Sequence, residues 1–326
     1  MRTSSSIVTT ESLSIGYAHQ PALMENLNLE VQRGKLTALL GPNGIGKTTL
    51  LRTLSGIHAP MKGKVLFKNT DLAQYTRQQI AKEISLVLTD KPALWSTTVY
   101  ELVSFGRYPY SSWIGQLSPL DHQKIEEAIQ LTHIDFLRHH AVDTLSDGQL
   151  QKVMIARALA QDGDLLLLDE PTAHLDLGNK IEIFRLLRTL ALKTQKAIVI
   201  STHELELAIE MTDCLWVLSC GADTLVGTPE ELLLSGALSQ RVSGKEYILN
   251  ELSGKFEIAH PAGPELAIEG NPKAAQWLAH FLRKNGFTIV PKAAQTLHIT
   301  DSPLQISLNN HVFDCFDDVI QALNKG

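Results

Sequence analysis

The sequence has few cysteines, no long hydrophobic run and no excess of basic charge. Its three cysteines, Cys214, Cys220 and Cys315, are odd in number and lack metal-ligand spacing, which favours reduced thiols over a disulfide framework. The longest strongly apolar runs, such as residues 165–168, are too short to span a bilayer, and residues 1–6 contain no apolar signal core. Any role at a membrane would therefore need a partner protein.

Charge narrows the class of partner. The chain carries 29 basic and 35 acidic side chains, a formal net charge of −6. That balance argues against a protein that coats nucleic acid or an anionic membrane, so we expect no nucleic-acid partner.

Length and patterning predict two domains. The chain has 326 residues, of which 44% are hydrophobic and 20% charged, as in globular proteins. Apolar runs alternate with helical patterns over residues 1–235, which indicates an α/β sheet, and helical patterns dominate residues 92–160. The pattern changes near Gly244. We therefore expect an α/β domain over 1–240 with a helical subdomain at about 92–160, and a small α+β domain over 245–326.

Several elements can be placed. Residues 36–40 predict a buried strand, followed by a glycine-rich turn and a helix that Gly56 ends, and residues 165–168 and 197–200 predict two more buried strands. Thr228 and Pro229 begin a further helix. In the second domain we expect strands at 256–258, 266–268, 287–290, 297–300 and 305–308, one helix from Pro272 to Gly286, and a last helix containing Val319.

A phosphate-binding loop follows the first of these strands. The residues match the pattern G-x-x-x-x-G-K-[ST] between a strand and a helix. Glycines let the backbone N–H groups face phosphates, and the helix start favours the same anion. Lys47 would neutralise the terminal phosphates, and the Thr48 hydroxyl would ligate Mg²⁺. The loop and the residue after it are Gly41, Pro42, Asn43, Gly44, Ile45, Gly46, Lys47, Thr48 and Thr49.

Three polar side chains follow the other buried strands. Asp169 and Glu170 come directly after residues 165–168, where their carboxylates should point in different directions. We assign Asp169 to Mg²⁺ and Glu170 to general base, deprotonating an attacking water. An acidic pair at this position could instead cap the next helix. His203 follows the strand at 197–200 and is a candidate contact for the terminal phosphate, although a lone histidine is often structural.

The order of motifs resembles that of the ATP-binding-cassette (ABC) ATPases. Residues 145–149 read LSDGQ, similar to the LSGGQ signature of that family, and residues 168–176 read LDEPTAHLD. The resemblance implies a P-loop NTPase fold, with a RecA-like core, a helical insert and an antiparallel β portion, and it implies ATP with Mg²⁺ as cofactors. The third signature position holds Asp147, a carboxylate to which we assign no phosphate contact.

The same resemblance implies a homodimer that holds two ATP molecules between its copies. Ser146, Gly148 and Gln149 would face the γ-phosphate bound by the partner's phosphate loop, and Asp176 would lie at the dimer seam. Tyr17 matches the aromatic residue that stacks on adenine in this family; the alternative is an ordinary surface or core tyrosine.

One position departs from the family pattern. A glutamine that touches Mg²⁺ and the attacking water is usual before the helical insert, but Thr89 occupies its place. Threonine is shorter, so we expect its hydroxyl to act through a water, with Asp90 as a possible substitute ligand. We therefore expect this loop to keep its place beside Mg²⁺ and the attacking water, but to contact them through a different chemical group.

Residues 98–103 and 106–109 resemble the ATPases of importers for iron-siderophore, haem and cobalamin. This implies membrane permease subunits, indirectly a solute-binding protein, and a peripheral location on the cytoplasmic face of the cell membrane. The aromatic segment 100–113 would dock the permease, or would serve only to pack the insert. Alternatives are a soluble ABC ATPase in cofactor assembly, translation or repair, and a nucleotide sensor that does not hydrolyse ATP.

The second domain carries several potential metal ligands without recognisable spacing. A dimer-stabilising or regulatory fold is the favoured interpretation over a metal sensor. The residues are His260, His280, His298, His311 and Cys315.

Overall fold

The computed structural model describes residues 6–89, 97–110, 116–309 and 311–323. The chain divides into two compact units, Met1–Arg241 with Glu251–Gly254, and Val242–Asn250 with Lys255–Gly326. Each unit is described by itself. Asp90 and residues 111–113 of the aromatic segment lie outside the described residues.

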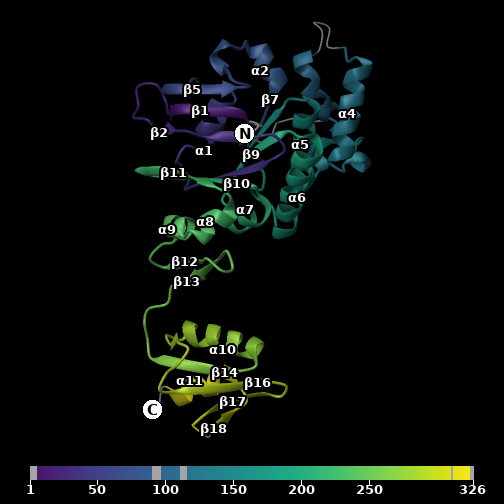
Figure 1. The fold of residues 1–326 in the computed structure, drawn as a ribbon. Coiled ribbons are helices and arrows are strands. Elements are labelled where there is room, and N and C mark those ends of the chain that lie inside the picture. The colour runs from purple at the N-terminus through teal and green to yellow at the C-terminus, as the bar shows by residue number, and fades with distance from the viewer. Residues whose placement is uncertain (1–5, 90–96, 111–115, 310, 324–326) are drawn as a thin grey trace. The chain divides into compact units, whose positions relative to one another are not determined.

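A six-stranded sheet forms the centre of the first unit (Figure 1). The strands are parallel except at one edge, where β11 is antiparallel. β4, β8 and β9 are buried along their whole length, as expected for strands covered on both faces. The three strands predicted at 36–40, 165–168 and 197–200 are thereby confirmed. In sheet order the strands are β11 (Ala222–Gly227), β10 (Cys214–Ser219), β4 (Leu36–Leu40), β9 (Ala197–Ser201), β8 (Leu165–Asp169) and β7 (Ile84–Val87).

An antiparallel sheet packs against the helix that follows β4. Ile15 and Phe67 of this sheet belong to the same buried cluster as Leu51 of α1. This packing fixes the start of α1 relative to the central sheet. The strands are β1 (Ser6–Ile15), β2 (Met24–Leu27), β3 (Glu30–Gln32), β5 (Lys62–Phe67) and β6 (Thr70–Asp71).

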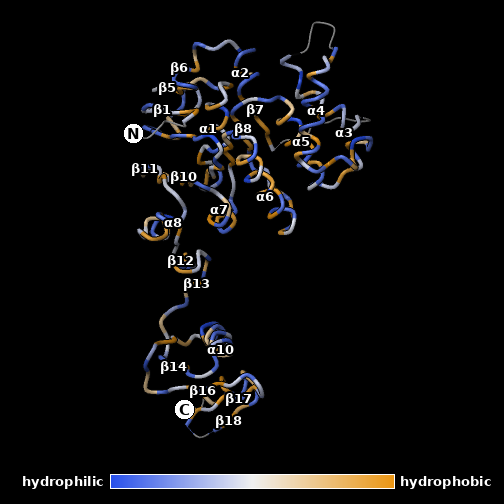
Figure 2. The backbone as a smooth tube through the Cα atoms, turned by 45° about the vertical axis from the view of Figure 1, so that its right-hand side comes forward, coloured by the Kyte–Doolittle hydropathy of each residue, from blue (hydrophilic) through white to orange (hydrophobic). Residues whose placement is uncertain are grey.

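Helices of the first unit show the periodic hydropathy of elements with one buried face, as Figure 2 shows for α5 and α6. Capping boxes at Thr98, Ser118 and Ser146 begin α3, α4 and α5, which pack on one another as the helical insert. The helices are α1 (Lys47–Leu54), α2 (Arg77–Glu83), α3 (Val99–Ser104), α4 (Pro119–Leu131), α5 (Asp147–Ala160), α6 (Leu177–Thr194), α7 (Leu205–Met211), α8 (Pro229–Leu234) and α9 (Ala237–Val242), with 3-10 turns η1 (Leu72–Gln74), η2 (Phe105–Tyr110), η3 (Asp135–Leu137) and η4 (Val142–Thr144).

The second unit contains a five-stranded sheet in the order β15-β14-β16-β17-β18 and a separate hairpin, β12–β13. Leu266, Leu278 and Leu297 lie in its own buried core. The strand predicted at 287–290 is shorter than expected, because only two residues pair with β14. The elements are β12 (Tyr247–Asn250), β13 (Lys255–Ile258), β14 (Glu265–Gly270), α10 (Pro272–Lys284), β15 (Thr288–Ile289), β16 (Thr296–Asp301), β17 (Leu304–Leu308), β18 (His311–Phe313) and α11 (Phe316–Leu323).

Two features that bear on function are absent from the described residues. None of the helices there combines the length and the apolar character that a membrane span requires. No three His, Cys, Asp or Glu side chains in that part of the chain gather as ligands for a metal ion.

Candidate functional site

The loop between β4 and α1 has the backbone of an anion cradle. Gly41, Gly44 and Gly46 have φ values of 153°, 78° and 113°, in the region that favours glycine. Gly46 is the N-cap of α1, and a Cβ added to Gly44 would find no atom within 4 Å. Backbone N–H groups can therefore approach a phosphate closely at the start of the helix.

Lys47 lies inside this loop and is only 6% exposed. Its ammonium donates to the carbonyls of Gly41 and Pro42 at 2.9 and 3.2 Å, and it lies 3.2 Å from His203 Nε2. Burial lowers the pKa of Lys47, and the carboxylate of Glu170 opposes that shift. A cation is thus held where the terminal phosphates of a nucleotide would lie.

Thr48 and Asp169 provide neighbouring oxygen atoms for a divalent cation. Thr48 Oγ1 donates to Asp169 Oδ2 at 2.7 Å, and Ser201 Oγ donates to Asp169 Oδ1 at 2.6 Å. Mg²⁺ prefers oxygen ligands and completes its shell with phosphates and water, so this donor set fits that ion. The sequence analysis did not identify Ser201 as a site residue. It is a polar residue at the end of β9, next to the end of β8, where Asp169 lies.

The Glu170 carboxylate contacts a different set of partners from the Asp169 carboxylate. Its Oε1 lies 2.7 Å from His203 Nε2 and 4.0 Å from Lys47 Nζ. The Glu170 N–H donates to Ser201 Oγ at 2.9 Å, and the residue has φ of 48°. The arrangement places a hydrogen-bonded carboxylate beside the phosphate loop.

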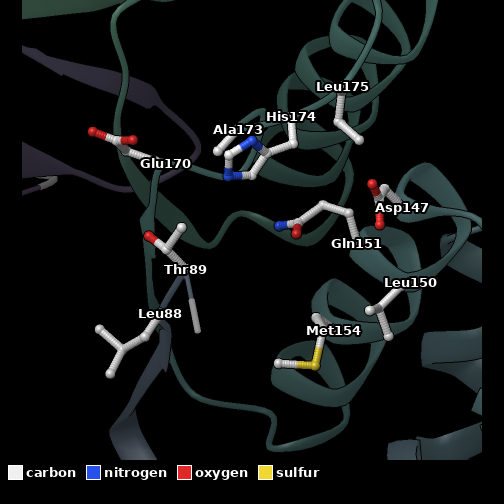
Figure 3. A pocket seen from close by; sticks show the side chains of 10 residues that line it. All are labelled: Leu88, Thr89, Asp147, Leu150, Gln151, Met154, Glu170, Ala173, His174 and Leu175. Carbon is white, nitrogen blue, oxygen red and sulfur yellow. The ribbon is translucent and has the colours of Figure 1, made fainter. Parts of the chain in front are cut away.

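Thr89 lies at the same strand end but is turned to the backbone. Its hydroxyl donates to the carbonyl oxygen of Asp169 at 3.0 Å. The proton is therefore directed to the main chain, while the oxygen lone pairs stay available to accept. The structure thus brings Thr89 beside the main chain of Asp169, on the wall of a small cavity that Glu170 also lines (Figure 3).

A cavity of about 350 Å³ extends from the phosphate loop to Tyr17. The Tyr17 hydroxyl shares a hydrogen bond with Thr49 Oγ1 at 3.2 Å, and its ring meets His58 edge-on with centroids 5.9 Å apart. Leu23 also lines the cavity. No sequence motif marks Leu23 or His58, because only the folded antiparallel sheet brings them beside Tyr17.

The signature residues form the start of α5. Ser146 is the N-cap, its hydroxyl accepts from the Gln149 N–H, and the Gln149 side chain accepts from the Ser146 N–H at 3.0 Å. Gly148 packs closely on α6, since a Cβ there would lie 2.7 Å from Asn179 Oδ1 and the Asn179 side chain would have to shift. Asp147 is the exposed first residue of the helix, where an acid interacts favourably with the helix dipole.

These residues are separate from the chain's own phosphate loop. Within the described part of the chain, neither Ser146, Gly148 nor Gln149 lines the cavity that contains Lys47. Asp176 caps α6 by accepting from the Asn179 N–H at 2.8 Å.

This fold and this loop define a P-loop nucleoside triphosphatase. The family model described as ABC transporter matches residues 24–173. The achromobactin transport ATP-binding protein of Dickeya dadantii is 38% identical over 226 residues, covering 69% of this chain and 84% of that protein. The iron(3+)-hydroxamate import ATP-binding protein of Bacillus subtilis is 36% identical over 233 residues, covering 72% and 86%.

A solved structure gives the same relationship. A Clostridium perfringens subunit of the ABC transporter complex cbiONQ superimposes with a TM-score of 0.64 at 32% identity, covering 73% of this chain and 94% of that one. The chain belongs to the ABC transporter family and is an ATP-binding, ATP-hydrolysing subunit. The predicted family is confirmed.

Proposed function

We propose that this ATPase drives an importer of an iron-siderophore or a similar metal chelate, such as haem or cobalamin, through separate permease subunits. The observation that carries the proposal is the similarity to ATPases named for achromobactin transport and iron(3+)-hydroxamate import, over 69% and 72% of the chain. ATP would be hydrolysed at the cytoplasmic face of the membrane, and a solute-binding protein would deliver the metal chelate to the permease.

The geometry around the phosphate loop supports a direct route for ATP hydrolysis. Lys47 and the α1 start would hold the β- and γ-phosphates. Thr48 Oγ1 and Asp169 would hold Mg²⁺, which neutralises charge on those phosphates. Glu170 would take the proton of the attacking water, while His203 fixes the orientation of its carboxylate across the 2.7 Å contact.

A second copy of the chain would complete the site. Ser146, Gly148 and Gln149 lie at a helix start, which suits an anion, yet they do not line the chain's own phosphate-loop cavity among the described residues. A homodimer would bring this start to the γ-phosphate of the other copy, with Asp176 at the seam. Asp147 adds a negative charge there and receives no phosphate contact in this proposal.

Exposed aromatic side chains on η2 supply a surface for the permease. Tyr108 is 80% exposed and Phe105 is 51% exposed. Both are carried by a turn that Arg107 anchors, because its Nε donates to Asp121 at 2.7 Å and its guanidinium carbon lies 3.9 Å from the Tyr110 ring centroid. An exposed aromatic cluster on a rigid turn is typical of a docking surface for a short helix.

The proposal can be tested by trapping the ATP-bound state. A tagged Glu170→Gln chain would be loaded with Mg²⁺ and ATP in its native membrane, and the proteins that co-purify would be identified. The control is the same chain without nucleotide. A multi-span permease and a bound metal chelate are expected; a ribosome, a DNA complex or a soluble assembly factor would contradict the importer and leave the ATPase chemistry standing.

The Glu170→Gln substitution also tests the general base. The amide cannot accept the proton of the attacking water, so hydrolysis should slow by about 10²–10⁴-fold with ATP binding retained. Steady-state ATPase rates and equilibrium ATP binding measure the two quantities. Glu210→Gln, at an exposed position on α7, is the control. A loss below tenfold would remove Glu170 from this role.

A further inference from the structure

The cavity that begins at the phosphate loop is bounded elsewhere by the Tyr17 ring. Tyr17 and Leu23 line this space of about 350 Å³ together with residues of the loop. Tyr17 is 42% exposed, so part of its ring surface is open. An aromatic ring in a cavity that also holds a phosphate cradle offers a stacking surface for the base of a nucleotide.

The main chain around Tyr17 is held, but its side chain needs a further constraint. Leu23 N–H donates to the Ile15 carbonyl at 2.8 Å, and Gln20 N–H donates to the Tyr17 carbonyl at 3.1 Å, which closes the turn between β1 and β2. A half-exposed tyrosine on a fixed main chain can still choose among about three χ1 rotamers. Stacking on a base requires one of them.

Two side chains from the segment of α1 contact Tyr17. The Tyr17 hydroxyl shares a hydrogen bond with Thr49 Oγ1 at 3.2 Å. The His58 ring meets the Tyr17 ring at 88° with centroids 5.9 Å apart, the edge-to-face arrangement that ring pairs prefer. Within the described residues, His58 does not line the cavity, and its side chain has no hydrogen bond or ion pair. It therefore contacts the ring that lines the cavity from outside the cavity.

The end of α1 determines where His58 lies. Gly56 has φ of 74°, and the N–H groups of Ile57 and His58 both donate to the Arg52 carbonyl, at 3.0 and 3.1 Å. This is a helix end of the glycine-terminated kind, in which the chain turns sharply and its course is fixed. Because α1 starts at Lys47, one short helix carries the phosphate cradle at its start and a support for Tyr17 just beyond its end.

We propose that His58 is a positioning residue for the base of the nucleotide, because it selects the Tyr17 rotamer that presents the ring to the cavity. The inference rests on the proposed function, in which Lys47 and the start of α1 hold the phosphates, so that the base extends along the cavity to Tyr17. His58 acts only through Tyr17. Its effect is therefore confined to ligands that carry a base.

The test compares two ligands in the full chain. His58→Ala, made in the Glu170→Gln chain so that ATP is not consumed, should raise the Kd for ATP about threefold, since the ring would then be in the bound rotamer only about a third of the time. The Kd for inorganic tripolyphosphate, which has no base, should not change. With Glu170 intact, His58→Ala should raise KM for ATP by the same factor and leave kcat within about twofold.

Further variants separate positioning from packing. His58→Phe keeps a ring at this place and should restore the Kd for ATP. Tyr17→Ala removes the stacking surface and should raise the Kd for ATP at least about fivefold. His58→Ala should add nothing in the Tyr17→Ala chain, because it acts through the ring that is gone. Ile57→Ala is the matched control, since Ile57 lies at the same helix end and is 62% exposed.

Four results would overturn the inference. They are an unchanged Kd for ATP in His58→Ala, an equal loss of affinity for tripolyphosphate, a further loss when His58→Ala is added to Tyr17→Ala, and an equal effect of Ile57→Ala. Failure of His58→Phe to restore binding would likewise exclude the ring contact as the cause.

The outcome is distinct from that of the proposed function. A chain that shows the base-dependent loss but captures no permease contradicts the importer and leaves the role of His58 standing. A chain that captures the permease, but in which His58→Ala binds ATP as tightly as the parent chain, does the reverse.

Discussion

At the scale of single residues, side chains expected to bind phosphate also build local structure. Ser146 and Gln149 cap each other at the start of α5, and Asp176 caps α6. Replacing any of them would weaken a helix start by about 1 kcal/mol as well as remove a proposed contact. A lost function there is therefore informative only when the stability of the variant is measured too.

The residues of the phosphate loop could be predicted because their geometry is local. Strand, turn and helix are contiguous over residues 36–54, and glycine spacing alone indicates the turn. Ser201 could not be predicted in the same way, since it joins Asp169 and Glu170 from more than thirty residues further along the chain.

Thr89→Gln restores the glutamine that is usual in the family at this position and so tests what its absence does to the ATPase. The substitution removes the hydroxyl that donates to the Asp169 carbonyl and adds an amide long enough to reach the Mg²⁺ site. We expect the ATPase rate to change and the Mg²⁺ concentration for half-maximal activity to fall by about threefold, as an added oxygen ligand would cause.

A companion variant separates the two effects. Thr89→Val removes the hydroxyl without adding a ligand, and should lower the rate without moving the Mg²⁺ dependence. If Thr89→Gln leaves both the rate and the Mg²⁺ dependence unchanged, the chemistry of this loop does not depend on position 89.

At the scale of elements, the turn η2 is fixed by a close approach to α5. A Cβ on Gly106 would lie 2.2 Å from the Arg157 carbonyl oxygen. Gly106→Ala must therefore push η2 away from α5, and should destabilise the protein by about 2 kcal/mol in urea unfolding. Gly178→Ala is the control, because its Cβ would meet nothing closer than 3.6 Å and alanine favours the helix by about 1 kcal/mol. If Gly106→Ala is as stable as the wild type in urea, η2 can move away from α5 without loss of stability.

The start of α4 should make stability depend on acid pH. The Ser118 hydroxyl, followed by the Ser118 N–H and Arg107, lowers the pKa of Asp121 to about 2 against the opposing effect of burial. Because the folded-state pKa lies below the ordinary value of 3.8, this stabilisation is complete above pH 4 and is lost as the pH falls towards 2.

Urea unfolding of the wild type and Asp121→Asn measures that contribution. The wild type should be more stable by at least about 1 kcal/mol at pH 6, since Asn leaves the buried Arg107 without its charge partner. The difference should shrink near pH 2. Asp135→Asn, at an exposed position, should show no such trend. A difference that is constant from pH 6 to pH 2 would rule out the ionised Asp121 as its source.

Long or strongly patterned elements were predicted better than short ones. The strands β4, β8 and β9 and the helices α8, α10 and α11 follow from apolar runs and caps. The strands β12 and β18 were not predicted, since each is only three or four residues long and is defined by its pairing partner. Strand order also depends on distant pairing, which no local pattern records.

At the scale of the whole molecule, the chain has two units with separate buried cores. The phosphate loop and its neighbours belong to the first unit, and no residue of the candidate site lies in the second unit's core. Binding of ATP should therefore stabilise the first unit alone, by about 2.7 kcal/mol at a ligand concentration one hundred times Kd.

Calorimetry of the full chain tests this independence. The Glu170→Gln chain, which should bind ATP without consuming it, is expected to show two transitions, of which only one moves upward when Mg²⁺ and ATP are added. Lys47→Ala removes the cation of the phosphate loop, so adding Mg²⁺ and ATP should leave the temperatures of both of its transitions unchanged. If ATP instead moves both transitions together, the second unit senses the nucleotide and belongs to the regulatory machinery of the ATPase. If it moves only one, the core of the second unit is energetically separate from the nucleotide site.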